Sequence, residues 1–141
     1  MSFLLDTNVV SEWGKPRPNA GVVGWLAEVD EDRTFISVIT LAELRHGVER
    51  LSPGSRRTRL ESWLRYELPL RFEARILSVD VAVADAWGKI VARGDAKGRP
   101  VNSMDAFLAA TAEIHNLTLV TRNIADFQKL TKSVVNPWDY S

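Results

Sequence analysis

Three acidic residues, widely separated in the sequence, carry the chemistry that this chain could perform. Asp6, Glu43 and Asp105 are the candidate catalytic carboxylates. There is no cysteine and there are only two histidines, which excludes thiolate nucleophiles and argues against a zinc site. Carboxylates alone form a hard-oxygen site that suits Mg²⁺, with Mn²⁺ expected to substitute for it. Such an ion can activate water for in-line attack on a phosphodiester, so the residue types predict metal-assisted hydrolysis.

The elements that must position these acids form an alternating pattern of strands and helices. Short apolar runs predict strands over residues 3–5, 34–38, 75–79 and 118–121, with an edge strand at 133–135. Helical periodicity predicts helices over 40–51, 55–68, 81–94 and 104–115, and shorter ones near 9–13, 22–29 and 124–130. Strands joined through helices are parallel. The sequence therefore predicts an α/β fold, an α/β/α sandwich around a central, mainly parallel sheet of four to five strands.

The acids are expected at the sheet edge where ligands bind, beyond the carboxyl ends of the strands. Asp6 directly follows the first strand, Glu43 lies in the first turn after the second, and Asp105 is the second residue of the helix before the fourth. The two aspartates have a purely structural alternative, because aspartate at a helix start also serves as an N-cap. For Asp105 this alternative is weaker, since Ser103 is expected to cap that helix.

Glu43 is the most informative of the three acids. It lies beside the apolar stripe of its helix rather than opposite it, and a glutamate at the margin of the core requires a partner. That partner is either an arginine, Arg45 or Arg50, or a cation held by several acids. A cation held by several converging acids accounts for all three acidic positions together.

Composition indicates one globular domain over residues 1–141. Eighteen basic residues balance eighteen acidic ones, so any site for a polyanion must be local. No segment approaches the ~18 apolar residues of a membrane span, and the start of the sequence has no leader-like pattern. We therefore expect a cytoplasmic protein without membrane association.

Arginines are concentrated between residues 45 and 75, where eight arginines accompany four glutamates. One interpretation is a solvated helix face with ion pairs four residues apart, such as Glu61 with Arg65. The other is a basic rim that holds phosphates. The sequence leaves both open.

Four segments, in order, resemble the successive motifs of PIN-domain toxins of the VapC type. They are Leu5-Asp6-Thr7-Asn8-Val9, the segment Ile39 to Gly47, the segment Asp105 to Ala112, and the segment Val120 to Phe127. The closing Asn136-Pro137-Trp138 is similar to the end of the FitB-like branch. Each motif is weak alone, but four in order at this spacing form a specific pattern that spans the chain from Leu4 to Trp138.

The resemblance implies a PIN-like fold and a magnesium-dependent endoribonuclease, the toxin of a type II toxin–antitoxin pair. It implies Asp6, Glu43 and Asp105 as metal ligands, supported by Thr7, Asn8 and Thr121. Arg45 and Arg122 are candidate RNA contacts. The implied partners are a small DNA-binding antitoxin whose tail covers the active site, an RNA substrate and a second copy of the toxin, so that a homodimer and a toxin–antitoxin hetero-oligomer are expected.

One position departs from the family pattern. Many relatives have a fourth acid where this chain has Asn123, which can orient water or bind metal through its carbonyl but adds no charge. Asp126, three residues later, is the alternative for this catalytic position. The neutral Asn123 also keeps open an inert PIN-fold module that binds RNA or a partner. A phosphatase using Asp6 is a further alternative, although it usually needs a second aspartate where Asn8 stands.

Overall fold

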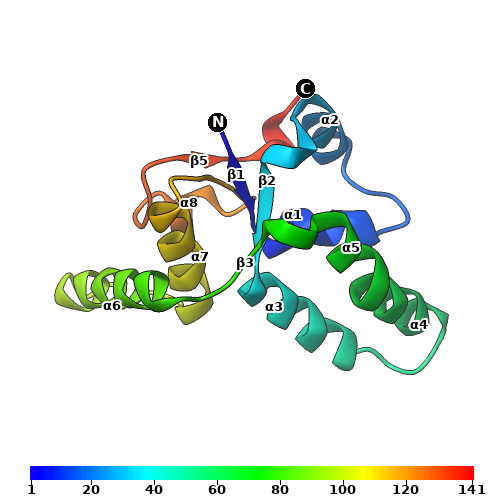
Figure 1. Ribbon diagram of the computed structural model, residues 1–141, viewed down its shortest axis with the longest axis horizontal. Coiled ribbons are helices and arrows are strands. Elements are labelled where there is room, and N and C mark those ends of the chain that lie inside the picture. The colour runs from blue at the N-terminus through cyan, green and yellow to red at the C-terminus, as the bar shows by residue number, and fades with distance from the viewer.

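The computed structural model covers residues 1–141 and contains one five-stranded sheet, in which all neighbouring strands are parallel. The strand order is β3-β2-β1-β4-β5, with β1 in the centre (Figure 1). The strands are short: β1 is Phe3–Leu5, β2 Thr34–Ser37, β3 Ile76–Leu77, β4 Thr118–Val120 and β5 Val134–Val135. The predicted fold class, with a parallel sheet of four to five strands, is confirmed.

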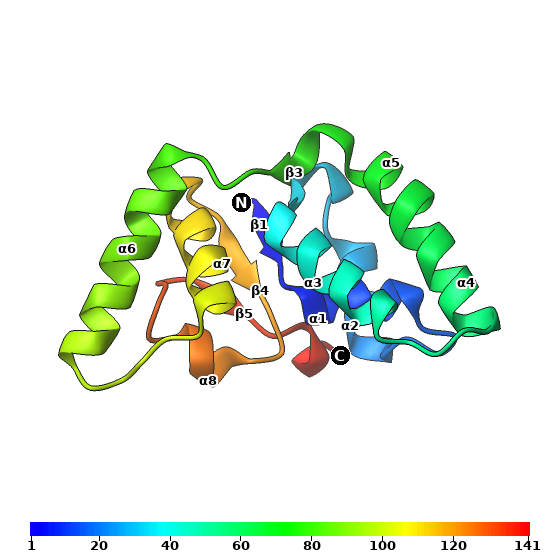
Figure 2. The ribbon, with the colours of Figure 1, turned by 90° about the horizontal axis from the view of Figure 1, so that it is seen from below.

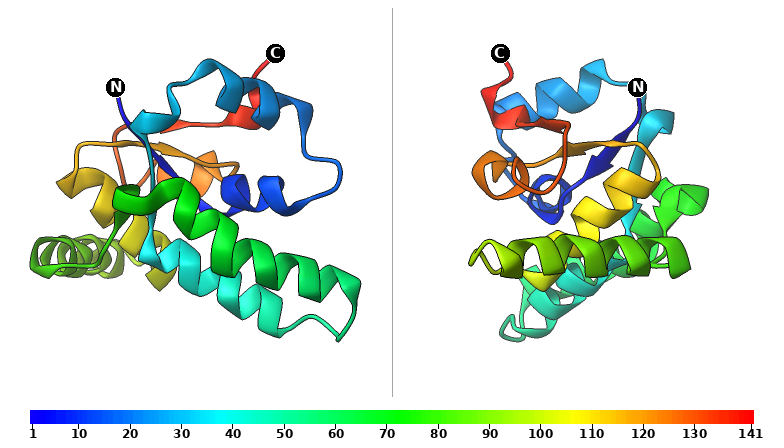
Figure 3. Two further views of the ribbon diagram at one scale, coloured as in Figure 1. Left: turned by 45° about the vertical axis from the view of Figure 1, so that its right-hand side comes forward. Right: turned by 90° about the vertical axis from the view of Figure 1, so that its left-hand side faces the viewer.

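Helices connect the strands and cover both faces of the sheet. Figure 2 shows α6 and α7 on one side and α3, α4 and α5 on the other. In Figure 3, α7 lies between α6 and the strands. No helix has both the length and the apolar character that crossing a bilayer requires. The helices are α1 Thr7–Val10, α2 Ala20–Glu28, α3 Val38–Glu49, α4 Ser55–Ser62, α5 Leu68–Phe72, α6 Val81–Ala96, α7 Ser103–Ile114 and α8 Ile124–Phe127.

The two faces of the sheet carry separate cores because side chains alternate along a strand. Leu5 of the central strand packs into a core with α1, α2, α3 and α5, whereas the preceding residue, Leu4, packs against α7 and α8. A third, alanine-rich cluster joins α6 to α7. The end of β1, where Asp6 lies, is therefore enclosed from both faces.

Several element boundaries differ from those predicted. Pro69 does not end the helix that begins at Ser55, because the turn before it widens into a π-helix at Trp63–Glu67 and the helix continues to Phe72. In that turn, Leu68 N donates to the Trp63 carbonyl, five residues back. The strand β3 has only two residues because its neighbour β2 ends at Ser37, which leaves later residues without a partner.

The N-cap predicted at Ser103 is also wrong. Asn102 caps α7, and its Oδ1 accepts hydrogen bonds from Met104 N at 2.9 Å and Asp105 N at 3.2 Å. Asparagine caps a helix by the same kind of hydrogen bond as serine, so the sequence correctly indicated a cap, but the capping residue lies one position earlier. The consequence for Asp105 is unchanged, since its carboxylate is not needed as a cap.

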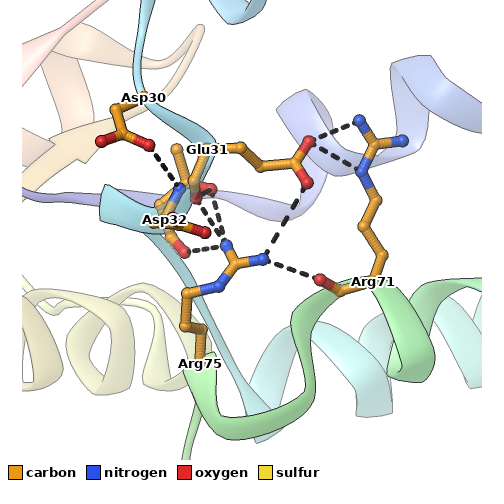
Figure 4. A network of polar contacts seen from close by, with 6 residues as sticks. Asp30, Glu31, Asp32, Arg71 and Arg75 are labelled. Carbon is orange, nitrogen blue, oxygen red and sulfur yellow. Dashed lines mark hydrogen bonds and ion pairs between the residues drawn. The ribbon is translucent and has the colours of Figure 1, made fainter.

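The arginines between residues 45 and 75 are mostly bound within the fold. Five of them (45, 57, 65, 71 and 75) form ion pairs with glutamates, including Arg65 with Glu61 at 3.6 Å. Figure 4 shows how Glu31 holds Arg71 and Arg75, while Arg75 also donates to the carbonyls of Glu31, Thr34 and Arg71. The ion-paired helix face, rather than a free basic rim, is the better description of this segment.

We predict that Phe72→Ala lowers the free energy of unfolding by about 3–5 kcal/mol, because the ring is fully buried beside Trp13. Leu70→Ala, two residues earlier on the same helix, is the matched control. Leu70 is 70% exposed, so its loss should change stability by less than about 0.5 kcal/mol. Urea denaturation followed by circular dichroism measures both, and equal losses in the two variants would contradict this packing.

Candidate active site

Asp6 occupies the carboxyl end of the central strand and is held by three hydrogen-bond donors. Its Oδ1 accepts from Thr7 N at 2.7 Å, and its Oδ2 accepts from Thr121 Oγ1 at 2.7 Å and Asn8 Nδ2 at 3.1 Å. Thr121 follows the neighbouring strand β4, so this contact ties two strand ends together. Asp6 thus does cap α1, but the N–H of Thr7 uses only one of its oxygens.

Burial raises the pKa of the Asp6 carboxyl, since the side chain is shielded from water. The hydrogen bonds from Thr121, Thr7 and Asn8 act in the opposite direction, and the nearby Glu43 carboxylate raises the pKa further. The net result is an elevated pKa. Asp6 is therefore an acid whose ionised form lacks a compensating positive charge.

Glu43 contacts the same strand end through a threonine. Thr7 Oγ1 donates to Glu43 Oε1 at 2.6 Å, and the buried Thr40 places its hydroxyl oxygen 3.1 Å from that of Thr7. Because each hydroxyl has a single proton, Thr7 uses its own for the carboxylate and can accept one from Thr40. Glu43 forms no ion pair, so the alternative in which Arg45 or Arg50 is its partner is wrong.

Thr40 was not identified as a site residue from the sequence. The signal was present, because Thr40 precedes Glu43 by three residues and residues at this spacing share a helix face. The α3 helix begins at Val38, with Ser37 as its N-cap, rather than at Thr40 as predicted. Thr40 therefore lies within the first turn of the helix, where it can support Thr7.

Asp105 lies in the first turn of α7, half-buried, with three acidic neighbours. Burial raises the pKa of its carboxyl to about 6, and the charges of Asp6, Asp126 and Glu43 contribute to the rise. These contributions bring the three predicted carboxylates, and Asp126 with them, into electrostatic contact. The fold thus brings together Asp6, Glu43 and Asp105, which are more than 30 residues apart from one another in the sequence.

Asp126 and Asn123, the two candidates for the fourth position of the site, have different surroundings. Asp126 is exposed in the first turn of α8, and its charge acts on Asp105. Asn123 precedes α8, and its backbone N–H donates to Thr121 Oγ1 at 3.0 Å, while its side chain makes no capping bond. The acidic candidate is the one that is electrically coupled to the cluster.

The two arginines considered as RNA contacts have different surroundings. Arg45 pairs with Glu61 at 2.7 Å and Glu49 at 3.3 Å. Arg122 lies over the ring of Trp138, 5.2 Å from its centroid, and its backbone N–H donates to Asn8 Oδ1 at 3.3 Å. Arg122 is thus next to the residues that hold Asp6, whereas Arg45 is engaged by other partners.

Glu12 is a buried acid that sequence reasoning did not single out. It pairs with Lys15 and accepts a hydrogen bond from Asn19 N at 2.8 Å. Burial alone would raise the pKa of Glu12, but the hydrogen bonds from Lys15 and Asn19 and the charges of Lys15 and Arg122 lower it. Its carboxylate is already satisfied, which gives it a structural role in the loop before α2.

The donor set fits a hard divalent cation. The pKa values of Asp6 and Asp105 are raised, and the neighbouring charges of Glu43 and Asp126 contribute to the rise, so this group of acids lacks a positive charge that a cation would provide. In this conformation no three acidic or histidine side chains converge closely enough to bind one ion. Mg²⁺ does not require that convergence, because it usually keeps several waters and binds through one or two carboxylates. Direct ligation by Asp6, Glu43 and Asp105 together stays a prediction.

A family model for the PIN domain matches residues 3–132. The chain belongs to the PIN-domain family. Toxin FitB of Neisseria gonorrhoeae is 38% identical to this PIN domain and aligns over 96% of the chain and 98% of the toxin. VapC ribonuclease Y4jK of Sinorhizobium fredii is 31% identical, over 97% of the chain and 98% of the relative. The structure of FitAB bound to an IR36 DNA fragment superimposes with a TM-score of 0.89 at 35% identity, covering 99% and 97% of the two chains.

The relatives place this PIN domain among the VapC and FitB toxins, as the order of its motifs indicated. The similarity extends over nearly the full length of both proteins, and the fold agrees over the same extent. The PIN domain therefore shares the whole architecture of these toxins, including the sheet edge that carries its acids.

We predict that Asp105→Asn stabilises the metal-free PIN domain at neutral pH. The folded pKa of about 6 exceeds the ordinary value of 3.8, so the folded state binds more protons between these limits and loses stability as pH rises through them. Above about pH 7 the gain should be roughly 1–2 kcal/mol, or about 3–6 °C in melting temperature, after allowing for solvent access to this half-buried group.

The measurement is thermal unfolding in EDTA across pH. The difference between Asp105→Asn and the wild type should be largely lost by about pH 4 and vanish at about pH 3, below the ordinary pKa of 3.8, where the Asp105 carboxyl is protonated in both the folded and the unfolded state. Asp85→Asn, a fully comparable change on an exposed ion pair of α6, should show no such pH dependence. A variant that is less stable than the wild type at neutral pH would contradict the electrostatic description of Asp105.

Proposed function

We propose that this PIN domain is a metal-dependent endoribonuclease and the toxin of a type II toxin–antitoxin pair. The observation that carries the proposal is the grouping of four acids: Thr7 donates hydrogen bonds to both Asp6 and Glu43, Asp105 and Asp126 line one pocket, and the charges of the other three acids act on Asp105. Such a cluster, without histidine or cysteine, suits a hard cation and a phosphate substrate. The toxin and ribonuclease relatives support the same reaction.

The residues divide into those that would hold a cation and those that orient them. Asp6 and Asp105 are the proposed central ligands, with Glu43 and Asp126 binding directly or through water. Mg²⁺, for which Mn²⁺ can substitute, would supply the Lewis acid that activates water and balances charge at the phosphodiester. Thr121 and Asn8 fix the Asp6 carboxylate, and Thr7 fixes that of Glu43.

These positioning bonds also favour the ionised carboxylates. A threonine hydroxyl or asparagine amide that donates to a carboxylate stabilises its charged form, which is the form that binds a cation. Because Thr121 follows β4 and Asn8 lies in α1, two separate segments hold Asp6 in one orientation while substrate binds. Residues of this supporting kind usually contribute 10–100-fold to metal affinity or activity.

The alternatives are less consistent with these contacts. A phosphatase using Asp6 would need a second carboxylate two residues later, but Asn8 occupies that place and donates to Asp6. An inert binding module would have no use for the repulsion that the other acids exert on Asp105, which reduces the stability of the metal-free fold. Cation-assisted hydrolysis is the function that gives a role to all four acids.

We further propose that the PIN domain assembles with a small DNA-binding antitoxin, forms homodimers and acts in hetero-oligomers. The support is the FitAB structure bound to DNA, which this chain matches over nearly its whole length, together with the toxin name of FitB. In this arrangement a tail of the antitoxin would cover the acidic edge and keep RNA away from it.

The function is tested by incubating the purified domain with single-stranded RNA and Mg²⁺ or Mn²⁺. Cleavage should occur, stop in EDTA and fall at least about 100-fold in Asp6→Asn and Asp105→Asn, because each change removes a charge that holds the cation. Asp85→Asn, the same change at an exposed site on α6, should retain full activity. Cleavage that survives both site changes, or a wild type that cuts no RNA with either ion, would defeat the proposal.

A second comparison assigns the fourth position. We predict that Asp126→Asn weakens Mg²⁺ binding and lowers kcat roughly 10-fold, because its charge acts on Asp105. Asn123→Ala, which removes no charge, should change either quantity by less than about threefold. Isothermal titration with Mg²⁺ and single-turnover cleavage measure the two effects. The reverse order of effects would assign the position to Asn123.

A further inference from the structure

A basic pocket opens directly beside the acidic cluster. It has a volume of about 400 Å³, within the ~300–1,000 Å³ range of ligand-binding pockets, and Asp105 and Asp126 form part of its wall. Four cationic side chains also line it, namely Arg93, Lys97, Arg99 and Lys129. The pocket therefore shares a wall with the proposed catalytic site, and its four cationic side chains outnumber the two acids.

The four cations of this basic pocket are free to bind a ligand. None of them forms an ion pair within the chain, in contrast to the five paired arginines between residues 45 and 75. All four are exposed. Because the chain has no net charge, a polyanion would need a local group of cations, and the pocket provides one.

The wall that carries these cations has a defined backbone. The chain turns back at Gly98, whose φ of +66° is readily adopted by glycine, and Arg99 N then donates to the Gly94 carbonyl at 2.8 Å. A Cβ on Gly94 would lie 2.7 Å from the Arg99 carbonyl oxygen and 2.6 Å from Val101 Cγ2. Only glycine at position 94 permits this close approach, which holds Arg99 against the end of α6.

A helix dipole explains only part of this arrangement. Arg93 and Lys97 lie at the carboxyl end of α6, where a cation is favoured by the dipole. Arg99 lies in the following loop, and Lys129 comes from the turn after α8, more than 30 residues away in the sequence. Two separate segments therefore bring unpaired positive charge to one cavity, and α6 alone does not account for it.

We propose that the basic pocket binds the sugar–phosphate backbone of an RNA nucleotide next to the phosphate that is cleaved. The inference rests on the proposed ribonuclease function and assigns a substrate-binding site to it. Arg93, Lys97, Arg99 and Lys129 would contact phosphate, and Asp105 in the shared wall would hold the cation. The adjacent acidic and basic side chains would align a single strand of RNA. The scissile phosphate would then lie at the acidic cluster, and the next phosphate along the strand would lie at the basic side chains of the pocket.

The test uses Arg93→Gln/Arg99→Gln and Lys97→Gln/Lys129→Gln. Binding of a fluorescent single-stranded RNA of about 12 nucleotides is measured by anisotropy in EDTA, so that no cleavage occurs. Each double variant should bind roughly 10-fold more weakly, and the slope of log affinity against log salt should fall by about 0.7 for each lost phosphate contact. With Mg²⁺, KM should rise while kcat changes less than about twofold.

Two controls separate binding from structure. Arg33→Gln/Arg50→Gln removes the same charge at two exposed arginines outside the pocket that form no ion pair, and it should bind RNA like the wild type. Arg93→Lys/Arg99→Lys keeps both charges and should restore most of the affinity and the salt slope. Melting temperatures of all variants should remain within a few degrees of the wild type, because the changed side chains are exposed.

The outcomes distinguish the pocket from the reaction. If the wild type cleaves RNA but the pocket variants keep its affinity and salt slope, the pocket proposal is overturned and the ribonuclease function stands. If the wild type binds RNA through the pocket and cleaves nothing, the ribonuclease function fails and the RNA-binding site is supported. If the pocket variants cleave RNA normally but lose binding to a purified antitoxin, the pocket is a protein-docking site and the RNA proposal is overturned.

Discussion

The bond between Thr121 Oγ1 and Asp6 Oδ2, at 2.7 Å, is the contact on which the site depends. It joins the ends of two neighbouring parallel strands, and the backbone repeats the connection, since Asp6 N donates to the Val120 carbonyl at 2.9 Å. A central strand with cores on both faces leaves its last residue little freedom to move. The orientation of the Asp6 carboxylate is therefore set by the sheet itself, and the other acids are brought to it by helices.

This arrangement makes the acidic edge an electrostatically unfavourable part of an otherwise satisfied fold. No buried side-chain polar atom lacks a hydrogen-bond partner, yet Asp6 and Asp105 both have raised pKa values. Hydrogen bonds satisfy the oxygen atoms of Asp6 without neutralising the charge of the cluster. The unfavourable energy at this site thus comes from the buried and mutually close carboxylate charges, and binding a cation would reduce it.

Much of the fold and the identity of the acids could be predicted from the sequence, because both depend on local patterns. Apolar periodicity identified the strands and helices, and the parallel connections placed Asp6, Glu43 and Asp105 at one edge. The roles of these residues, and the single domain over 1–141, stay predictions. Longer-range contacts were not readable. The π-helical turn at Trp63–Glu67 lets the helix continue past Pro69. Thr40 supports Glu43 only through Thr7. The basic pocket is lined by segments that are far apart in the sequence.

The two-residue edge strands β3 and β5 have a consequence for assembly. An exposed edge normally offers a row of unpaired backbone groups on which another chain can add a strand, and such edges promote aggregation. Here Ile76–Leu77 and Val134–Val135 are too short to template more than a fragment of pairing. The sheet edges therefore offer little backbone for a neighbouring chain to pair with, which favours association through side chains on helices and loops.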